Sequence, residues 1–178
     1  MSGYIFTSKR LGFRNWKISD TDRLFEINSN KDVMQFFPST QTKEQTEAFI
    51  TKMQNQYAKK EFCYFAVEIL ETKEFIGFIG LSLQTFELDF TPAIDIGWRL
   101  HPNFWHKGFA TEGAKRCLDF GFNQLKLEKI IAVAPVINIP SISIMQKIGM
   151  NKVQNFKHSL LKEYTQLETC VLYVKKNT

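Results

Sequence analysis

Two consecutive runs, Ala93-Ile-Asp-Ile-Gly-Trp-Arg-Leu100 and His101-Pro-Asn-Phe-Trp-His-Lys-Gly-Phe-Ala-Thr111, decide the fold. The first run alternates apolar and polar side chains as a strand does, and Pro102, which lacks an N–H donor, ends it. From Gly108 to Leu125 small and apolar residues recur at helical spacing, which predicts an amphipathic helix packed on a sheet. The beginning of this helix therefore follows the end of a strand.

Such a junction can bind phosphate, because unpaired N–H groups and a partial positive charge meet at a helix N-terminus. Gly108 permits a close approach of the backbone, and Lys107 adds a full positive charge. A lone glycine at such a turn more commonly serves conformation or packing. A second set of residues downstream favours phosphate binding over a purely conformational role. After a buried strand at 129–134, Asn138-Ile-Pro-Ser141 begins another helix, and Gly149 ends it.

The remaining segments add strands and helices on both sides of this junction. Leu11–Trp16 alternates as a half-buried strand does, Ser19-Asp20 offers an N-cap to a first helix, and Thr42 begins a second helix. Short apolar runs predict further strands at 62–67, 75–83 and 168–174. No repeat, linker or low-complexity segment interrupts them, so we expect one α/β (α+β) domain over residues 1–178 with a mixed sheet.

The composition argues against several classes of protein. The chain has 178 residues, of which 44% are hydrophobic, enough apolar bulk for a core of its own. Its 23 Lys and Arg outnumber its 18 Asp and Glu, but they are scattered, so a nucleic-acid-binding domain ranks well below the other hypotheses. Three separated cysteines form neither a disulfide framework nor a metal site, and no run reaches the ~20 apolar residues of a membrane span. We expect a cytoplasmic protein that binds no metal, nucleic acid or membrane.

Trp105 to Glu112 resembles a known motif. The first signature of the GNAT acyltransferases is Gln or Arg, two residues, Gly, one residue, then Gly or Ala, and here Gly108 and Ala110 occupy its small positions. Trp105 replaces the usual Gln or Arg, and the motif is then similar to that of one branch of the family, the ribosomal-protein N-terminal (alanine/serine) acetyltransferases. The resemblance implies a mostly antiparallel central sheet, flanked by helices and splayed between the fourth and fifth strands.

The resemblance also implies that acetyl-CoA is the cosubstrate, and it indicates which residues bind it. Main-chain groups near Trp98 and Leu100 would pair with the pantetheine arm as an extra strand does, and Asn138 and Ser141 would contact it from the second helix. Backbone N–H groups of one loop would hold the pyrophosphate: His106, Lys107, Gly108, Phe109, Ala110 and Thr111.

Acyl transfer to an amine needs a base, because an amine of pKa ~10 is almost wholly protonated near neutral pH. Asp95, on the central strand beside the expected thioester, is the first candidate, and an ion pair or a solvent-exposed acid is the alternative interpretation. Many GNAT enzymes place a proton-donating Tyr where this chain has Met145. Ser141 is the replacement that we favour, although a serine near a helix start is also a common cap and a thiolate can leave without help.

The acceptor is expected to be a primary amine, either a protein N-terminus or a small molecule such as a polyamine, aminoglycoside or amino acid. Phe37 and His158 lie on segments that the cofactor does not occupy in the resemblance, and they are candidate substrate contacts. A coenzyme-A-binding module without catalysis is the alternative, which Met145 at the usual acid position favours. The sequence leaves both a monomer and a homodimer open.

Overall fold

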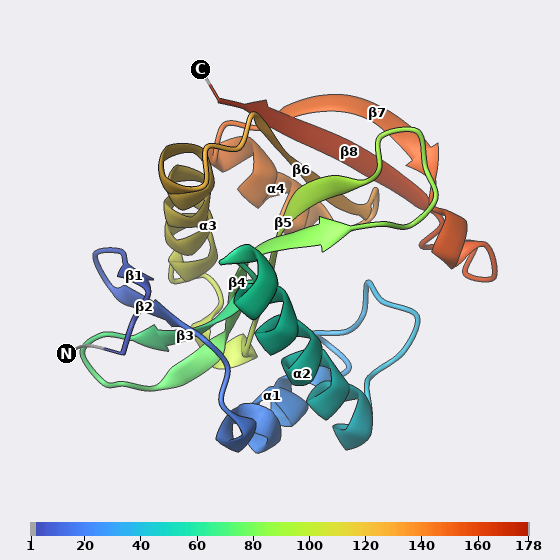
Figure 1. Ribbon diagram of the computed structural model, residues 1–178. Coiled ribbons are helices and arrows are strands. Elements are labelled where there is room, and N and C mark those ends of the chain that lie inside the picture. Colours follow the sequence, from blue (N-terminus) through green and yellow to red (C-terminus); the bar gives the residue numbers. More distant parts are fainter. Residues whose placement is uncertain (1–2, 178) are drawn as a thin grey trace.

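An eight-stranded sheet runs through residues 3–177, the part of the chain that the computed structural model describes (Figure 1). Its strands are β1 (Phe6–Thr7), β2 (Leu11–Arg14), β3 (Tyr64–Ile69), β4 (Phe75–Gln84), β5 (Ala93–Leu100), β6 (Lys129–Pro135), β7 (Asn151–Lys157) and β8 (Thr169–Lys176). They lie in the order β1-β2-β3-β4-β5-β6-β8-β7. Every neighbouring pair is antiparallel except β5 and β6, which are parallel. The mixed, mostly antiparallel sheet expected from the sequence is therefore confirmed.

Helices cover both faces of this sheet. They are α1 (Thr21–Asn28), α2 (Lys43–Lys60), α3 (Phe109–Asp119), which continues into a π-helical turn over Phe120–Gln124, and α4 (Ile139–Lys147), with short 3-10 segments at Ile18–Asp20, Pro102–Phe104 and Ser159–Leu161. The ring of Phe49 on α2 lies 5.2 Å from that of Phe78 on β4, whereas Gly113 on α3 packs against Ile79, the next residue of β4. Successive strand residues point to opposite faces, so α2 and α3 lie on opposite sides of the sheet (Figure 1). Within residues 3–177 no helix has the length and apolarity that crossing a bilayer requires.

The sheet opens between β5 and β6. Each of the eight residues of β5 is paired with β4, but among the described residues Asp95 and Ile131 are the single register pair between β5 and β6. Beyond Asp95 the two strands separate toward their carboxyl ends. The short β1 was not predicted from the sequence, so β5 and β6 are the fourth and fifth of the predicted strands. The splay that was expected between them is confirmed.

Two features near the N-terminus differ from the sequence-based expectation. β2 is buried along its whole length rather than half-buried, because the ring of Tyr4 covers Gly12 and carboxylates pair with Arg14. Asp20 does not cap α1 with its side chain. Its carboxylate instead accepts two hydrogen bonds from the guanidinium of Arg14, both 2.8 Å long, and one from the N–H of Lys17. Pairing this buried guanidinium takes precedence over capping the helix.

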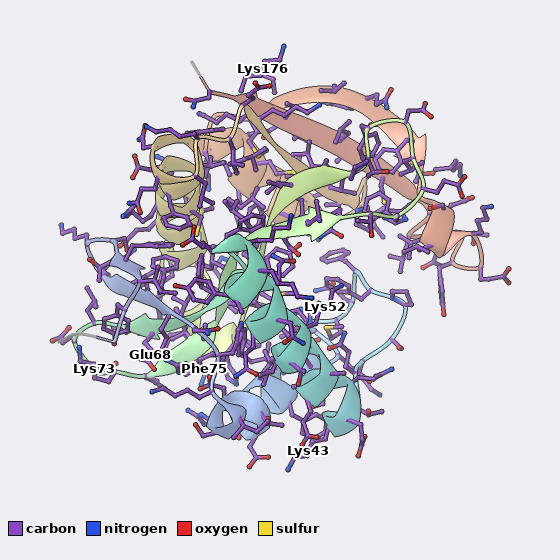
Figure 2. All side chains as sticks on the ribbon, in the orientation of Figure 1. Lys43, Lys52, Glu68, Lys73, Phe75 and Lys176 are labelled. Carbon is purple, nitrogen blue, oxygen red and sulfur yellow. The ribbon has the colours of Figure 1, made fainter. Side chains whose placement is uncertain are left out.

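Replacing Asp20 by Ala should lower the free energy of unfolding by about 3 kcal/mol or more. The guanidinium of Arg14, with only 7% of its side chain exposed, would keep a single carboxylate partner, that of Glu68 on β3 (Figure 2). Glu26→Ala, which removes an exposed ion pair with Arg23, is the control and should change the free energy by less than ~0.5 kcal/mol. Urea unfolding measures both variants, and equal losses would contradict a stabilising role for the buried pair.

Candidate active site

The loop between β5 and α3 presents a row of backbone N–H groups. Its backbone is left-handed at His106, with φ 59°, and at Gly108, with φ 77°, whereas φ is negative at Lys107 between them. Such an alternation turns successive N–H groups toward one side and forms a nest, a concavity that binds anions. α3 then begins at Phe109, and the N–H groups of its first turn have no acceptor within the helix. Loop and helix together suit a phosphate group.

Contacts from distant parts of the chain hold this loop. The indole N–H of Trp105 donates to the carbonyl of Leu100 at 2.9 Å, and the guanidinium of Arg10 donates to the carbonyl of Lys107 at 3.0 Å. Arg10 also pairs with Glu112 on α3, with 2.6 Å between Nε and a carboxylate oxygen. Burial opposes ionisation of Glu112, but the hydrogen bonds that it accepts outweigh burial and lower the pKa of this carboxyl. Sequence reasoning missed these supporting roles because 102 residues separate Arg10 from Glu112.

A second helix N-terminus lies at the same end of the sheet. β5 and β6 are parallel, so α4, which follows β6, starts at the end where α3 follows β5. The side-chain oxygen of Asn138 accepts a hydrogen bond from the N–H of Ser141 at 3.2 Å, so the cap of α4 is Asn138 and not Ser141. Met145, at the position where a proton-donating Tyr is usual, is a core residue with 2% of its surface exposed.

Asp95 is the residue of β5 that pairs with β6, at the closed end of the opening. The hydroxyl of Tyr64 donates to its carboxylate at 2.6 Å, and the side-chain amide of Gln84 donates to that hydroxyl at 3.0 Å. Burial raises the pKa of Asp95 to about 6, while hydrogen bonds from Tyr64 and Gln84 and the charge of Lys52 act in the opposite direction. Burial and the negative charge of Asp95 also raise the pKa of Tyr64 well above its ordinary value.

Neither alternative interpretation of Asp95 fits its surroundings. No ion pair among residues 3–177 includes its carboxylate. Its side chain is half-buried rather than solvent-exposed, and the hydroxyl of Tyr64 fixes its position. Tyr64 therefore holds this carboxylate in one orientation, and burial raises its pKa to about 6.

The predicted cofactor residues meet at the open end of the sheet, but not all offer their side chains. The ring of Phe109 is buried in the core, so its backbone is the part that remains available. Trp98 lies opposite Ile79 in register and shares its face, the one that α3 covers, whereas Asp95 points to the other face. The carbonyl of Leu100 already accepts the indole N–H of the loop.

The two predicted acceptor contacts lie on separate segments. Phe37, between α1 and α2, lies over the guanidinium of Arg99, with 4.4 Å from Cζ to the ring centroid. His158 follows β7 and contacts Phe86, with ring centroids 4.6 Å apart and ring planes tilted by 40°. Its Nδ1 accepts the N–H of Leu160. Burial lowers the pKa of His158. The two segments that carry Phe37 and His158 both lie toward the right of Figure 1.

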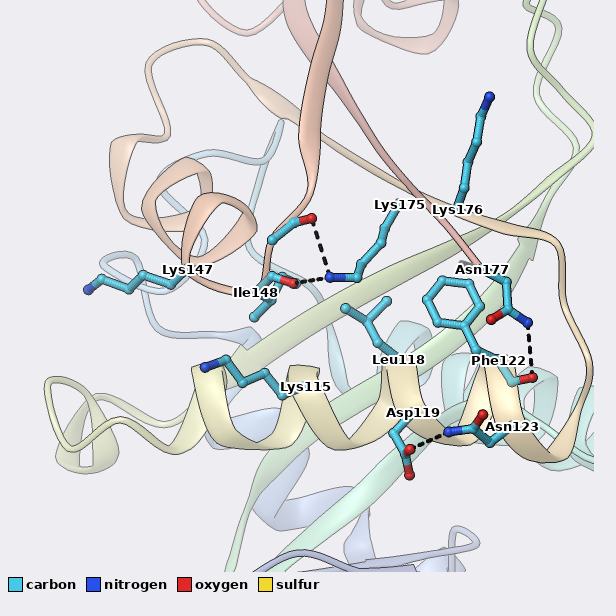
Figure 3. Close-up of a pocket in the computed structure, with 11 residues that line it drawn as sticks. Lys115, Leu118, Asp119, Phe122, Asn123, Lys147, Ile148, Lys175, Lys176 and Asn177 are labelled. Atoms are coloured by element: carbon cyan, nitrogen blue, oxygen red, sulfur yellow. Dashed lines mark hydrogen bonds between the residues drawn. The ribbon is translucent and has the colours of Figure 1, made fainter.

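A separate pocket of ≈ 470 Å³ lies between α3, the end of α4 and the end of β8 (Figure 3). The amine of Lys175 donates to the carbonyl of Ile148 at 3.0 Å beside it. Its cationic lining residues are Lys115, Lys147, Lys175 and Lys176. None of the site residues predicted from the sequence lines this pocket, so it is distinct from the opening between β5 and β6.

None of the three cysteines supplies the site with a reactive thiol. The three cysteines are free and buried, and burial raises the pKa of each thiol: Cys63, Cys117 and Cys170. A buried thiol with a raised pKa is a poor nucleophile. Within residues 3–177 no group of three or more His, Cys, Asp or Glu side chains is arranged to hold a metal ion.

The loop with left-handed backbone at His106 and Gly108 lies at the open end of a splayed sheet, and a helix starts beyond each of the two parallel strands. This arrangement suits a phosphate-bearing cosubstrate. Residues 10–151 match the family model of the acetyltransferase (GNAT) domain. The chain belongs to the GNAT family and is an acetyl-CoA-dependent N-acetyltransferase.

Relatives and solved structures agree with this family. The chain is 34% identical over 157 residues to the uncharacterized N-acetyltransferase YnaD of Bacillus subtilis (strain 168), with 88% of each chain covered. It is similar to the crystal structure of a GNAT-family acetyltransferase from Bacillus anthracis, at 28% identity and a TM-score of 0.80 over 96% of this chain and 97% of that one. The ribosomal-protein-S5-alanine acetyltransferase of Vibrio fischeri, 19% identical, shares the fold with a TM-score of 0.76 over 97% and 96% of the two chains.

Gly108→Ala should lower the free energy of unfolding by about 1 kcal/mol, because an L side chain is strained in left-handed backbone. An added Cβ would have room, with its nearest neighbour 3.5 Å away on Arg10, so the cost comes from the backbone. Gly3→Ala makes the same chemical change in open space and should alter stability by less than ~0.5 kcal/mol. Thermal and urea unfolding measure both, and a neutral Gly108→Ala would show that the left-handed turn is not required.

Proposed function

We propose that the enzyme transfers the acetyl group of acetyl-CoA to a primary amine by direct attack within a ternary complex, with Asp95 as the base. The observation that carries this proposal is the position of Asp95. It lies where the opening between β5 and β6 closes, and the N-termini of α3 and α4 lie at the other end of this opening. A base at that point can reach an amine that enters from the face opposite α3. Acetyl-CoA supplies an acetyl group already activated as a thioester.

The residues present fit the phosphate-bearing part of the cosubstrate. N–H groups from His106 to Thr111 would bind the pyrophosphate, which the alternating φ and the start of α3 support. Backbone groups of Trp98 and Leu100 on one side, and Asn138 and Ser141 on the other, would hold the pantetheine arm. The side-chain oxygen of Asn138 accepts the backbone N–H of Ser141, and this hydrogen bond fixes the positions of the two residues relative to each other.

Asp95 would accept the proton of the acceptor ammonium. A catalytic base works best when its pKa lies near the working pH, and the pKa of about 6 leaves this carboxylate ionised at neutral pH without making it too weak a base. The hydrogen bond from Tyr64 orients the carboxylate and leaves its lone pairs free to accept further hydrogen bonds. Tyr64 is therefore a positioning residue that sequence reasoning missed.

Direct attack is favoured because the described residues offer no nucleophile for an acetyl-enzyme intermediate. All three thiols are buried with raised pKa values. For the departing thiolate, Ser141 in the first turn of α4 is the proposed proton donor, since the buried Met145 cannot donate. Phe37 and His158 are proposed to border the acceptor.

The pH dependence of kcat/KM should separate Asp95 from the other groups. Asp95 must be ionised to take a proton from a protonated amine, so kcat/KM should fall about tenfold per pH unit below pH 6 and form a plateau from there up to the amine pKa of ~10. Release of the coenzyme A thiol, followed with a panel of primary amines between pH 5 and 9, measures this profile.

Asp95→Asn is the matched variant, because it keeps a similar shape and removes the base. It should lose about 10²- to 10⁴-fold in kcat/KM, and its residual rate should keep rising with pH, since only the neutral amine would then react. An inflection near pH 6 that persists in Asp95→Asn would assign the titration to another group. Binding of acetyl-CoA with no thiol release for any amine would favour the alternative of a non-catalytic coenzyme-A-binding protein.

A further inference from the structure

The guanidinium of Arg99 lies in an enclosed environment on the same face of β5 as Asp95. It is held between two aromatic rings, with Cζ 4.4 Å from the ring centroid of Phe37 and 5.2 Å from that of Phe78. One nitrogen, Nη1, donates to the side-chain oxygen of Asn28 at 2.7 Å. These contacts fix the plane of the guanidinium but satisfy one of its five N–H donors.

No carboxylate in the described part of the chain compensates this charge. None of the ion pairs among residues 3–177 includes Arg99, and its Nε is buried without a hydrogen-bond acceptor. Burial lowers the pKa of Arg99 to about 10, which still leaves it protonated at neutral pH. Arg99 as a whole is partly exposed, but a buried guanidinium nitrogen normally has a hydrogen-bond partner, so the unpaired Nε beside the proposed acceptor site indicates that a ligand supplies one.

The surroundings favour an anion over a further cation. Lys52 projects from α2 (Figure 2), and its charge acts on Asp95 although none of the described ion pairs includes it. The acceptor side of β5 thus carries the charges of Arg99 and Lys52 near the carboxylate of Asp95. A polyamine would meet repulsion there, whereas an amine with a negative group would be attracted.

The spacing of the two groups sets the length of such an acceptor. Asp95 and Arg99 are four residues apart on one strand face, which places their Cα atoms about 13 Å apart at a rise of ~3.3 Å per residue. The ring of Tyr64 lies over Gly97 between them, as an added Cβ on Gly97 would come within 2.9 Å of that ring. An acceptor that touches both ends must therefore have several bonds between its amine and its anionic group.

We propose that Arg99 determines specificity by binding an anionic group of the acceptor, so that the preferred acceptor is an amine that carries a carboxylate several bonds away. This inference rests on the proposed function, because it takes Asp95 as the position of the reacting amine. Phe37, from the loop between α1 and α2, covers the guanidinium and excludes water from the ion pair, which strengthens it.

The test compares acceptors that differ in charge alone. We expect 6-aminohexanoate to have a kcat/KM about 10- to 100-fold higher than 6-aminohexanamide with the wild-type enzyme, because a hydrogen-bonded charge is lost in the amide. Arg99→Met should remove this preference by raising KM for the carboxylate, with little change for the amide. Arg99→Lys keeps the positive charge but lacks the planar guanidinium, so it should retain part of the preference for the carboxylate that Arg99→Met loses.

A binding measurement keeps the inference testable apart from turnover. Calorimetric titration with 6-acetamidohexanoate, the acetylated product, should give an affinity at least tenfold weaker for Arg99→Met than for the wild type, with no difference for 6-acetamidohexanamide. A pair of tetrapeptides with Glu or Gln at the second position shows whether the anion sits on a free amino acid or on a peptide side chain.

Two results would overturn the inference. Equal kcat/KM for acid and amide in the wild type, or equal binding of the acetylated acid to the wild type and Arg99→Met, would reduce Arg99 to an anchor for Phe37 and Asn28. A loss of melting temperature without a change in acid-over-amide preference in Arg99→Met would likewise assign Arg99 a purely structural role. Failure of the proposed function is distinguishable, because it would abolish turnover of acids and amides alike while leaving the binding measurement unaffected.

Discussion

The separation of β5 from β6 beyond Asp95 is the constraint on which the rest of the site depends. In a continuous parallel pair, the N–H and C=O groups along the facing edges satisfy one another. Because the pairing stops at Asp95 and Ile131, the edge of β5 toward Leu100 is left facing a gap that an extended ligand can fill. The same separation holds the starts of α3 and α4 apart at the open end.

Hydrogen bonds from distant elements keep this opening in shape. Trp105 joins the loop between β5 and α3 to the end of β5, and Arg10 joins this loop to β2 and, through Glu112, to α3. Such contacts offset the strain of the left-handed backbone at His106. On the opposite face Tyr64 fixes Asp95, so contacts within the protein hold both the loop and this carboxylate in place.

Local patterns were enough to predict the central elements of the fold, because alternation over 93–100 and helical spacing after Gly108 are properties of neighbouring residues. Thr42 was likewise recognisable as the cap of α2, where it accepts the N–H of Gln45 at 3.2 Å. β7 escaped prediction because its residues are almost all exposed and show no apolar alternation. The site was predicted in part: its loop follows a local motif, but the contacts Tyr64–Asp95, Asn28–Arg99 and Arg10–Glu112 join residues 31, 71 and 102 positions apart, beyond the reach of a local pattern.

Amide hydrogen exchange with and without acetyl-CoA tests the central claim most directly, because it reports on each segment of the backbone. Binding in the opening should slow exchange at 106–111, at the edge of β5 from 96 to 100, and at the start of α4, and should leave the end of α3 unchanged. Slowed exchange confined to the lysine-lined pocket around Lys115 and Lys175, with none at 106–111, would contradict the assignment of the opening between β5 and β6 as the cosubstrate site.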